Sequence, residues 1–173
     1  DGAATDEVPP TLAESYAAVP AEALVNVELK VYGAGCRTAT TGPIELAAAG
    51  AAEVRALGVA DRTLFSSFDP VAAGAIREEG SGLYSALLLS VFESLDWPEG
   101  LDLSLRLDQD ALHPLFVIPS EGVAASLAAG LQVNVWTVNL VRDMEGALDA
   151  GVSAIITDEP AVLRQVIEGR GGG

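Results

Sequence analysis

The sequence predicts an α/β protein built around a parallel sheet. Short β-branched or apolar segments alternate with helical segments, and the helices begin at proline or capping residues and end at glycine. Each strand–helix unit takes roughly 25 residues, which is typical of parallel strands joined by right-handed crossovers. An open doubly wound sheet and a (β/α)8 barrel both fit this pattern, and the spacing alone does not choose between them.

The elements of the first half follow in order. Residues 25–31 alternate polar with β-branched or apolar side chains and predict a strand. Pro43 opens a helix that ends at Gly58. After a strand at 64–68, Asp69 and Pro70 predict the N-cap and first residue of the next helix. The nearly all-apolar residues 84–91 predict a strand covered on both faces.

The second half continues the alternation. Three further strands are expected, at 101–105, 133–138 and 154–156, the first of them a short extra one. Three helices are also expected: one capped by Ser120 and closed by Gly130, one carrying Met144 and Leu148 and closed by Gly151, and one capped by Asp158 with Val162, Leu163, Val166 and Ile167 on its buried side.

Length and composition limit the class of protein. The 173 residues predict one domain over 1–168, with 169–173 as a disordered tail. Half of the residues are hydrophobic, which is enough for a substantial core. Nine Lys and Arg against 25 Asp and Glu give a net charge of −16. Such a charge repels phosphate backbones and anionic lipids, so it argues against nucleic acid or a membrane surface as a partner.

Cysteine content and the chain start exclude further classes. The single Cys36 cannot form an intrachain disulfide, and no Cys/His cluster has zinc spacing. No apolar run reaches the ~18 residues of a transmembrane segment. The chain begins at Asp1 without a signal-peptide pattern, so we expect a start created by processing or by choice of the expressed segment, and the compartment stays open.

Glu28 and Lys30 are the strongest candidates for functional-site residues. Two positions apart on a strand, they project from the same face, opposite to Leu29. Lys30 is also the only lysine beside eight arginines, which indicates a position that needs a compact ammonium. The alternative is an ordinary surface ion pair on an edge strand. The only histidine, His113, is expected to be a structural or surface residue.

Five segments resemble motifs of the glycerophosphodiester phosphodiesterases, in the order of that family. Residues 26–30 (NVELK) are similar to its fourth strand and 64–70 (LFSSFDP) to its fifth strand and the following helix start. Residues 133–139 (VNVWTVN) and 155–160 (IITDEP) are similar to the seventh and eighth strands. Residues 10–14 (PTLAE) are similar to the family segment that precedes the fourth strand. The resemblance implies the (β/α)8 TIM-barrel class, here as an incomplete barrel of about five to six parallel strands.

The resemblance also implies an activity and a set of site residues. The family hydrolyses glycerophosphodiesters to an alcohol and glycerol 3-phosphate with a divalent cation, Mg²⁺ or Ca²⁺. By correspondence, Glu28 is a metal ligand, Lys30 stabilises charge on the phosphoryl oxygens, and Trp136, with Phe68, lines the substrate pocket. The family's two catalytic histidines and its other metal carboxylates lie on the first three strands, which have no counterpart in these 173 residues, so the metal site is expected to be incomplete.

An incomplete barrel has two unpaired edges and an uncovered inner face. We therefore expect a missing N-terminal segment to complete it, a second copy to pair with it, or its strands to rearrange into a smaller sheet. The first outcome is an enzyme in which the chain alone is inactive. The alternative is a catalytically inactive barrel fragment acting as an interaction or scaffold protein. A third reading, an unrelated α/β metabolite-binding domain, accounts for the alternation of elements but not for the order of the motifs.

Overall fold

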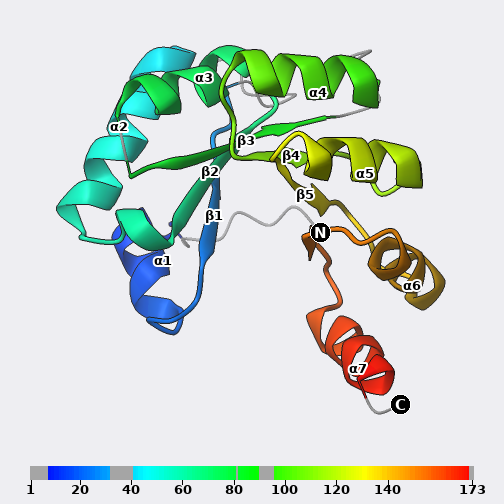
Figure 1. Ribbon diagram of the computed structural model, residues 1–173. Coiled ribbons are helices and arrows are strands. Elements are labelled where there is room, and N and C mark those ends of the chain that lie inside the picture. The colour runs from blue at the N-terminus through cyan, green and yellow to red at the C-terminus, as the bar shows by residue number, and fades with distance from the viewer. Residues whose placement is uncertain (1–7, 32–40, 81, 90–95, 172–173) are drawn as a thin grey trace, which may run out of the picture.

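The computed structural model describes residues 8–31, 41–80, 82–89 and 96–171. It is an arc of parallel strands with helices along its convex side, so that the sheet forms the wall of an open half-barrel (Figure 1). The six strands are β1 (Val25–Glu28), β2 (Thr63–Ser67), β3 (Tyr84–Leu88), β4 (Ala111–His113), β5 (Gln132–Val135) and β6 (Ala154–Ile155).

The strand order distinguishes a barrel from a doubly wound sheet. The strands lie in chain order, β1-β2-β3-β4-β5-β6, and every neighbouring pair is parallel. A doubly wound sheet reverses its order at one point and places helices on both faces, whereas a barrel adds each strand beside the last. The predicted fold class, an incomplete barrel of five to six strands, is therefore confirmed with six.

Three of the helices begin at capping side chains. Thr11 and Glu14 form a capping box at the start of the first helix, and the Asp69 carboxylate accepts hydrogen bonds from the backbone N–H groups of Val71 and Ala72. The helices are α1 (Leu12–Ala18), α2 (Pro43–Ala56), the 3₁₀ turn η1 (Ala60–Arg62), α3 (Pro70–Glu78), α4 (Trp97–Arg106), α5 (Ser120–Ala128), α6 (Val141–Asp149) and α7 (Pro160–Arg170).

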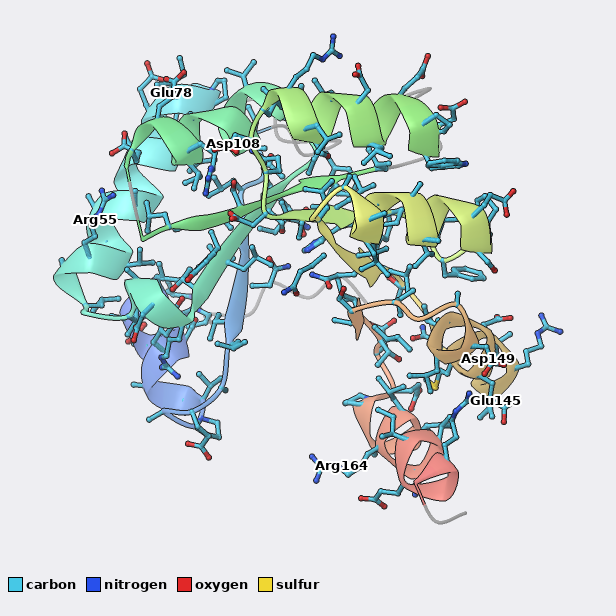
Figure 2. All side chains as sticks on the ribbon, viewed as in Figure 1. Arg55, Glu78, Asp108, Glu145, Asp149 and Arg164 are labelled. Atoms are coloured by element: carbon cyan, nitrogen blue, oxygen red, sulfur yellow. The ribbon has the colours of Figure 1, made fainter. Side chains whose placement is uncertain are left out.

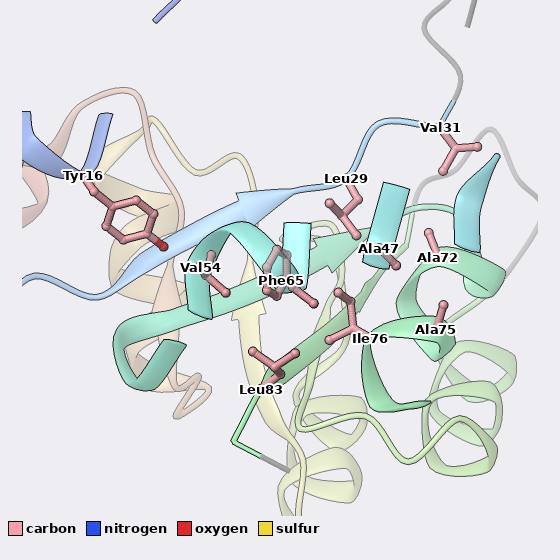
Figure 3. Close-up of a cluster of buried hydrophobic side chains, with 11 residues drawn as sticks. Tyr16, Leu29, Val31, Ala47, Val54, Phe65, Ala72, Ala75, Ile76 and Leu83 are labelled. Carbon is pink, nitrogen blue, oxygen red and sulfur yellow. The ribbon is translucent and has the colours of Figure 1, made fainter. Parts of the chain in front are cut away.

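The main core lies between the convex face of the sheet and the helices. Leu29 and Phe65 point from the first two strands into a cluster with Ala47 and Val54 of α2 and Ile76 of α3 (Figure 3). These side chains are at most 6% exposed. Because strand side chains alternate between faces, the neighbours of Leu29 and Phe65 must point to the concave face.

Exposed charged side chains lie on the helices around the sheet. Arg55, Glu78, Glu145 and Arg164 are exposed on four different helices (Figure 2).

Several predicted element boundaries differ from the structure. Residues 101–105 are not an extra strand but part of α4, because the Asp96 carboxylate caps that helix and Pro98 lies in its first turn. Ser120 is the first residue of α5, and Pro119 is the N-cap. The cap of α7 is Glu159, since Asp158 instead accepts a hydrogen bond from the Asn139 amide.

Other differences concern the extent of elements. The strands are shorter than their apolar runs, α1 and β4 were not anticipated, and α7 continues through Gly169 and Arg170, two residues beyond the predicted end of the domain. Ile167 is half exposed rather than buried, while Val162, Leu163 and Val166 pack against the core as expected. The predicted strand at 84–91 and the tail at 169–173 both run partly outside the described residues.

The strands have not rearranged to cover their own edges. Within the described part of the chain, β1 pairs only with β2, and β6 pairs only with β5. On the concave side of β1, Asn26 and Glu28 are exposed, whereas Val25 and Val27 on its other side pack against the core. The inner wall of the half-barrel is therefore accessible from the side of β1.

Candidate active site

Glu28 and Lys30 lie on the concave face at the carboxyl end of β1. Leu29, between them, is 6% exposed and packs into the helical layer, so its two neighbours project to the opposite side. Pairing with β2 continues past the strand end, because the backbone N–H of Leu29 donates to the Ser66 carbonyl at 2.7 Å and the Ser67 hydroxyl donates to the Leu29 carbonyl at 2.8 Å. The carboxyl ends of barrel strands are where barrel active sites form.

The two charged groups interact weakly. The Lys30 Nζ and Glu28 Oε2 atoms are 3.6 Å apart, and their side chains are 71% and 33% exposed. An ion pair with this exposure contributes little to stability. The pair is consequently free to interact with other groups at the rim.

Phe68 and Trp136 come together from different strands of the same rim. Phe68 follows β2 and Trp136 follows β5, and their rings meet edge to face with centroids 5.4 Å apart. Both side chains are half-buried. Phe68 lies two residues beyond Ser66, which is paired with Glu28, so it reaches the level of Lys30 on the neighbouring strand. The four predicted site residues thus share one rim of one face.

The described residues alone do not make a cation site. Magnesium takes about six oxygen ligands and calcium six to eight. Among the residues with described positions, no three His, Cys, Asp or Glu side chains gather where they could hold a metal. Glu28 can supply one carboxylate to such a site.

The structure brings together two buried polar residues whose partnership the sequence did not indicate. His113 ends β4 and Asn134 lies on β5, at 1% and 7% exposure, and the Asn134 Nδ2 atom is 2.8 Å from His113 Nε2. The Trp136 indole N–H donates to the carbonyl of His113 at 2.8 Å. His113 is buried rather than on the surface, and its carbonyl lies directly beside the predicted pocket wall. A useful signal was the two-residue spacing of Asn134 and Trp136, which places them on one face of β5.

Burial controls the protonation of this histidine. The imidazole loses its hydration inside the protein, and this burial lowers the pKa of His113 to about 4. At neutral pH the ring is therefore uncharged.

A cavity of about 560 Å³ lies at the opposite end of the strands. It is lined by residues at or just before the strand starts, among them Leu24, Leu64, Tyr84, Ala111 and Gln132. It is remote from the Glu28–Lys30 rim, because the strands are parallel and all of them begin at this end. We therefore place the candidate site at the carboxyl-end rim, where the charged and aromatic groups converge.

Six parallel strands in chain order, with helices on the convex side, define the fold class as that of a TIM barrel, here about half of one. The model of the glycerophosphoryl diester phosphodiesterase family matches residues 3–162. The chain belongs to this family.

Individual relatives agree with the family. A glycerophosphodiester phosphodiesterase from Caldanaerobacter subterraneus is 31% identical over 114 residues, which are 65% of this chain and 44% of the relative. A solved structure from Silicibacter pomeroyi, assigned to the glycerophosphoryl diester phosphodiesterases, is 27% identical with a TM-score of 0.73, over 86% of this chain and 51% of that one. An Oleispira antarctica phosphodiesterase solved with the product sn-glycerol-3-phosphate is 23% identical with a TM-score of 0.63, over 84% and 55%.

The chain thus spans about half the length of these relatives. Among the residues whose positions are described, every helix is too short or too polar to cross a membrane.

Proposed function

We propose that residues 1–173 form part of the active site of an enzyme that hydrolyses glycerophosphodiesters to an alcohol and glycerol 3-phosphate. The observation that carries the proposal is the position of Glu28 and Lys30 side by side on the concave rim, close to the level of Phe68. Family membership supports the class of reaction, and the bound product of the Oleispira antarctica relative supports glycerol 3-phosphate as one product.

Lys30 is proposed as the catalytic cation. Its ammonium is 71% exposed and held by one weak ion pair, so it can turn toward a phosphoryl oxygen without breaking buried contacts. A positive charge at that position would stabilise the negative charge that develops on the phosphoryl oxygens during hydrolysis, and such electrostatic stabilisation is commonly a large part of catalysis.

Glu28 is proposed as one carboxylate ligand of a divalent cation, Mg²⁺ or Ca²⁺. The group would act as a Lewis acid on the phosphodiester when bound. Among the described residues, no three potential metal-ligating side chains gather, and the remaining ligands and the proton-transfer groups are proposed to come from an N-terminal barrel segment.

Phe68 and Trp136 are proposed to form the apolar wall of the substrate pocket. Their edge-to-face contact fixes a flat surface beside the charged pair, at the same end of the strands. Such a surface would pack against the carbon chain of the glycerol moiety and exclude water from the phosphodiester.

The partner that completes the site is proposed to be an N-terminal barrel segment, with a self-pairing copy as the alternative. The unpaired edge of β1 and the accessible inner wall beside it are the surface such a segment would cover. The solved relatives are up to about twice as long as the matched region, which leaves room for the first strands of a barrel.

The test is a hydrolysis assay with glycerophosphocholine and Mg²⁺ or Ca²⁺, in which glycerol 3-phosphate is measured. Residues 1–173 alone are expected to be inactive, and the barrel completed with the N-terminal segment of the gene, or of a close relative, is expected to turn over. Lys30→Met in the completed protein should lower kcat on the order of 100-fold or more. The matched control is Arg106→Met, which removes an exposed cation paired with Asp102 at 3.2 Å on α4.

Three outcomes would contradict the proposal. Metal-dependent turnover by residues 1–173 alone would show that the missing groups are not needed. Equal turnover of Lys30→Met and Arg106→Met would remove the catalytic role of Lys30. A completed barrel that folds but does not hydrolyse any glycerophosphodiester would favour the alternative function, a catalytically inactive interaction or scaffold protein.

A further inference from the structure

We propose that His113 and Asn134 form a positioning pair that fixes the indole of Trp136 at the rim of the half-barrel. The inference rests on the proposed function only in taking Trp136 as a wall of the substrate pocket. The pair itself is a feature of the fold, and neither residue touches the reacting groups.

The pair joins the carboxyl ends of β4 and β5. The Asn134 amide nitrogen can only donate, so the His113 Nε2 atom, 2.8 Å away, must accept and the ring proton must lie on Nδ1. Both side chains are more than nine-tenths buried, so water has little access to compete for this hydrogen bond. The bond therefore sets one tautomer and one orientation of the imidazole.

The indole of Trp136 bonds to the backbone of the same histidine. Its carbonyl oxygen accepts two hydrogen bonds, from the backbone N–H of Leu89 on the β3 side at 2.9 Å and from the Trp136 Nε1–H at 2.8 Å. The ring of Phe68 meets the indole from another direction, edge to face. The orientation of Trp136 thus depends on where His113 lies between its two neighbouring strands.

Apolar side chains of similar volume at positions 113 and 134 would destabilise the folded state less than the polar pair does. Among the described residues, the His113 Nδ1 atom and the Asn134 Oδ1 atom have no hydrogen-bond partner, although both are buried. Unpaired buried polar atoms destabilise a protein, whereas leucine or valine at these positions would not carry that cost. A buried polar bond that is kept despite this cost is most useful where it selects one arrangement of its neighbours.

The experiment measures the accessibility of Trp136 by acrylamide quenching of its fluorescence. Trp97 is the only other tryptophan, so the measurement uses the full chain with Trp97→Phe as the reference. His113→Leu removes the acceptor, Asn134→Leu removes the donor from the other strand, and His113→Gln keeps an acceptor near the position of Nε2. No substrate is needed, so the result is independent of whether the protein hydrolyses glycerophosphodiesters.

The expected result is a rise in the Stern–Volmer constant by about a factor of two in both leucine variants, because a released indole reaches more exposed rotamers. His113→Gln should restore the reference value, which a purely space-filling role would not predict. Far-UV circular dichroism and urea midpoints identify which variants are folded. An unchanged constant in either folded leucine variant, or a rise in His113→Gln equal to that in His113→Leu, would overturn the inference.

Discussion

Lowering the pH from 7 to 5 should destabilise this protein by about 2 kcal/mol through His113 alone. Burial lowers the pKa of this imidazole to about 4 in the folded state, against roughly 6.5 in an unfolded chain. Between these values the unfolded state binds the proton and the folded state does not. The contribution of His113 to the free energy of unfolding is therefore fully present above about pH 6.5. It is lost as the pH falls toward 4, and the total loss has a limit of about 3 kcal/mol.

The assay is urea unfolding at pH 7 and at pH 5, comparing the wild-type chain with His113→Gln. Other groups that titrate in this range contribute equally to both proteins, so the difference between the two pH dependences isolates the histidine. A pH of 5 also keeps the acidic chain above its isoelectric point near 4.1, where solubility would be lowest. If the free energy of unfolding falls by the same amount in both proteins between pH 7 and pH 5, the lowered pKa of His113 is refuted.

Three further predictions concern stability and are measured by urea unfolding. Arg62→Met should destabilise the protein by about 2 kcal/mol, because the guanidinium donates to three backbone carbonyls within residues 20–23 and holds the lead-in to β1; an unchanged midpoint would refute this. Lys30→Met should change stability by less than about 0.5 kcal/mol, since its ion pair is exposed, and a larger loss would indicate a structural role. Gly100→Ala should cost roughly 1–3 kcal/mol, because a Cβ atom there would clash with a methyl carbon of the buried Leu89. The matched control is Gly146→Ala in α6, where an added Cβ atom would have no neighbour within 4 Å. This substitution should stabilise the protein by about 0.5–1 kcal/mol. Equal effects of the two alanines would show that helix propensity, rather than packing, governs both sites.

The parts of the fold that were predictable have local causes. Asp69 and Pro70 define a helix start by side-chain capping and a fixed φ angle, and the structure has that start. Residues 101–105 were predicted wrongly because Leu101, Leu103 and Leu105 alternate with polar residues as in a strand, although the cap that decides the matter is Asp96, several residues earlier. Only Leu105 of the three leucines is largely exposed, as tertiary packing of the helix dictates.

The candidate site was predictable in one respect and not in another. Alternation places Glu28 and Lys30 on one face of β1, but it does not say which face the helices cover. That is decided by α2 and α3, which bury Leu29. The partnership of His113 with Asn134 was not accessible from the sequence, because it depends on the register of β4 against β5, which pairs Leu112 with Val133.

The charges at the rim explain why the half-barrel is not expected to bind a phosphodiester unaided. Apart from Lys30, the cationic side chains in the described ranges belong to helices or to the turn η1, on the outside or at the ends of the wall. Charges separated by more than a Debye length, about 8 Å at physiological salt, are largely screened from one another. Within the described ranges, Lys30 is therefore the cation at the rim, and Glu28, 3.6 Å away, partly compensates its charge. Equilibrium dialysis of residues 1–173 against glycerophosphocholine should accordingly detect no binding at millimolar concentration, whereas Glu28→Gln, which leaves the ammonium uncompensated, should increase binding. Tight binding by the unaltered chain would mean that another positive group faces the rim and that the electrostatic role assigned to Lys30 is incomplete.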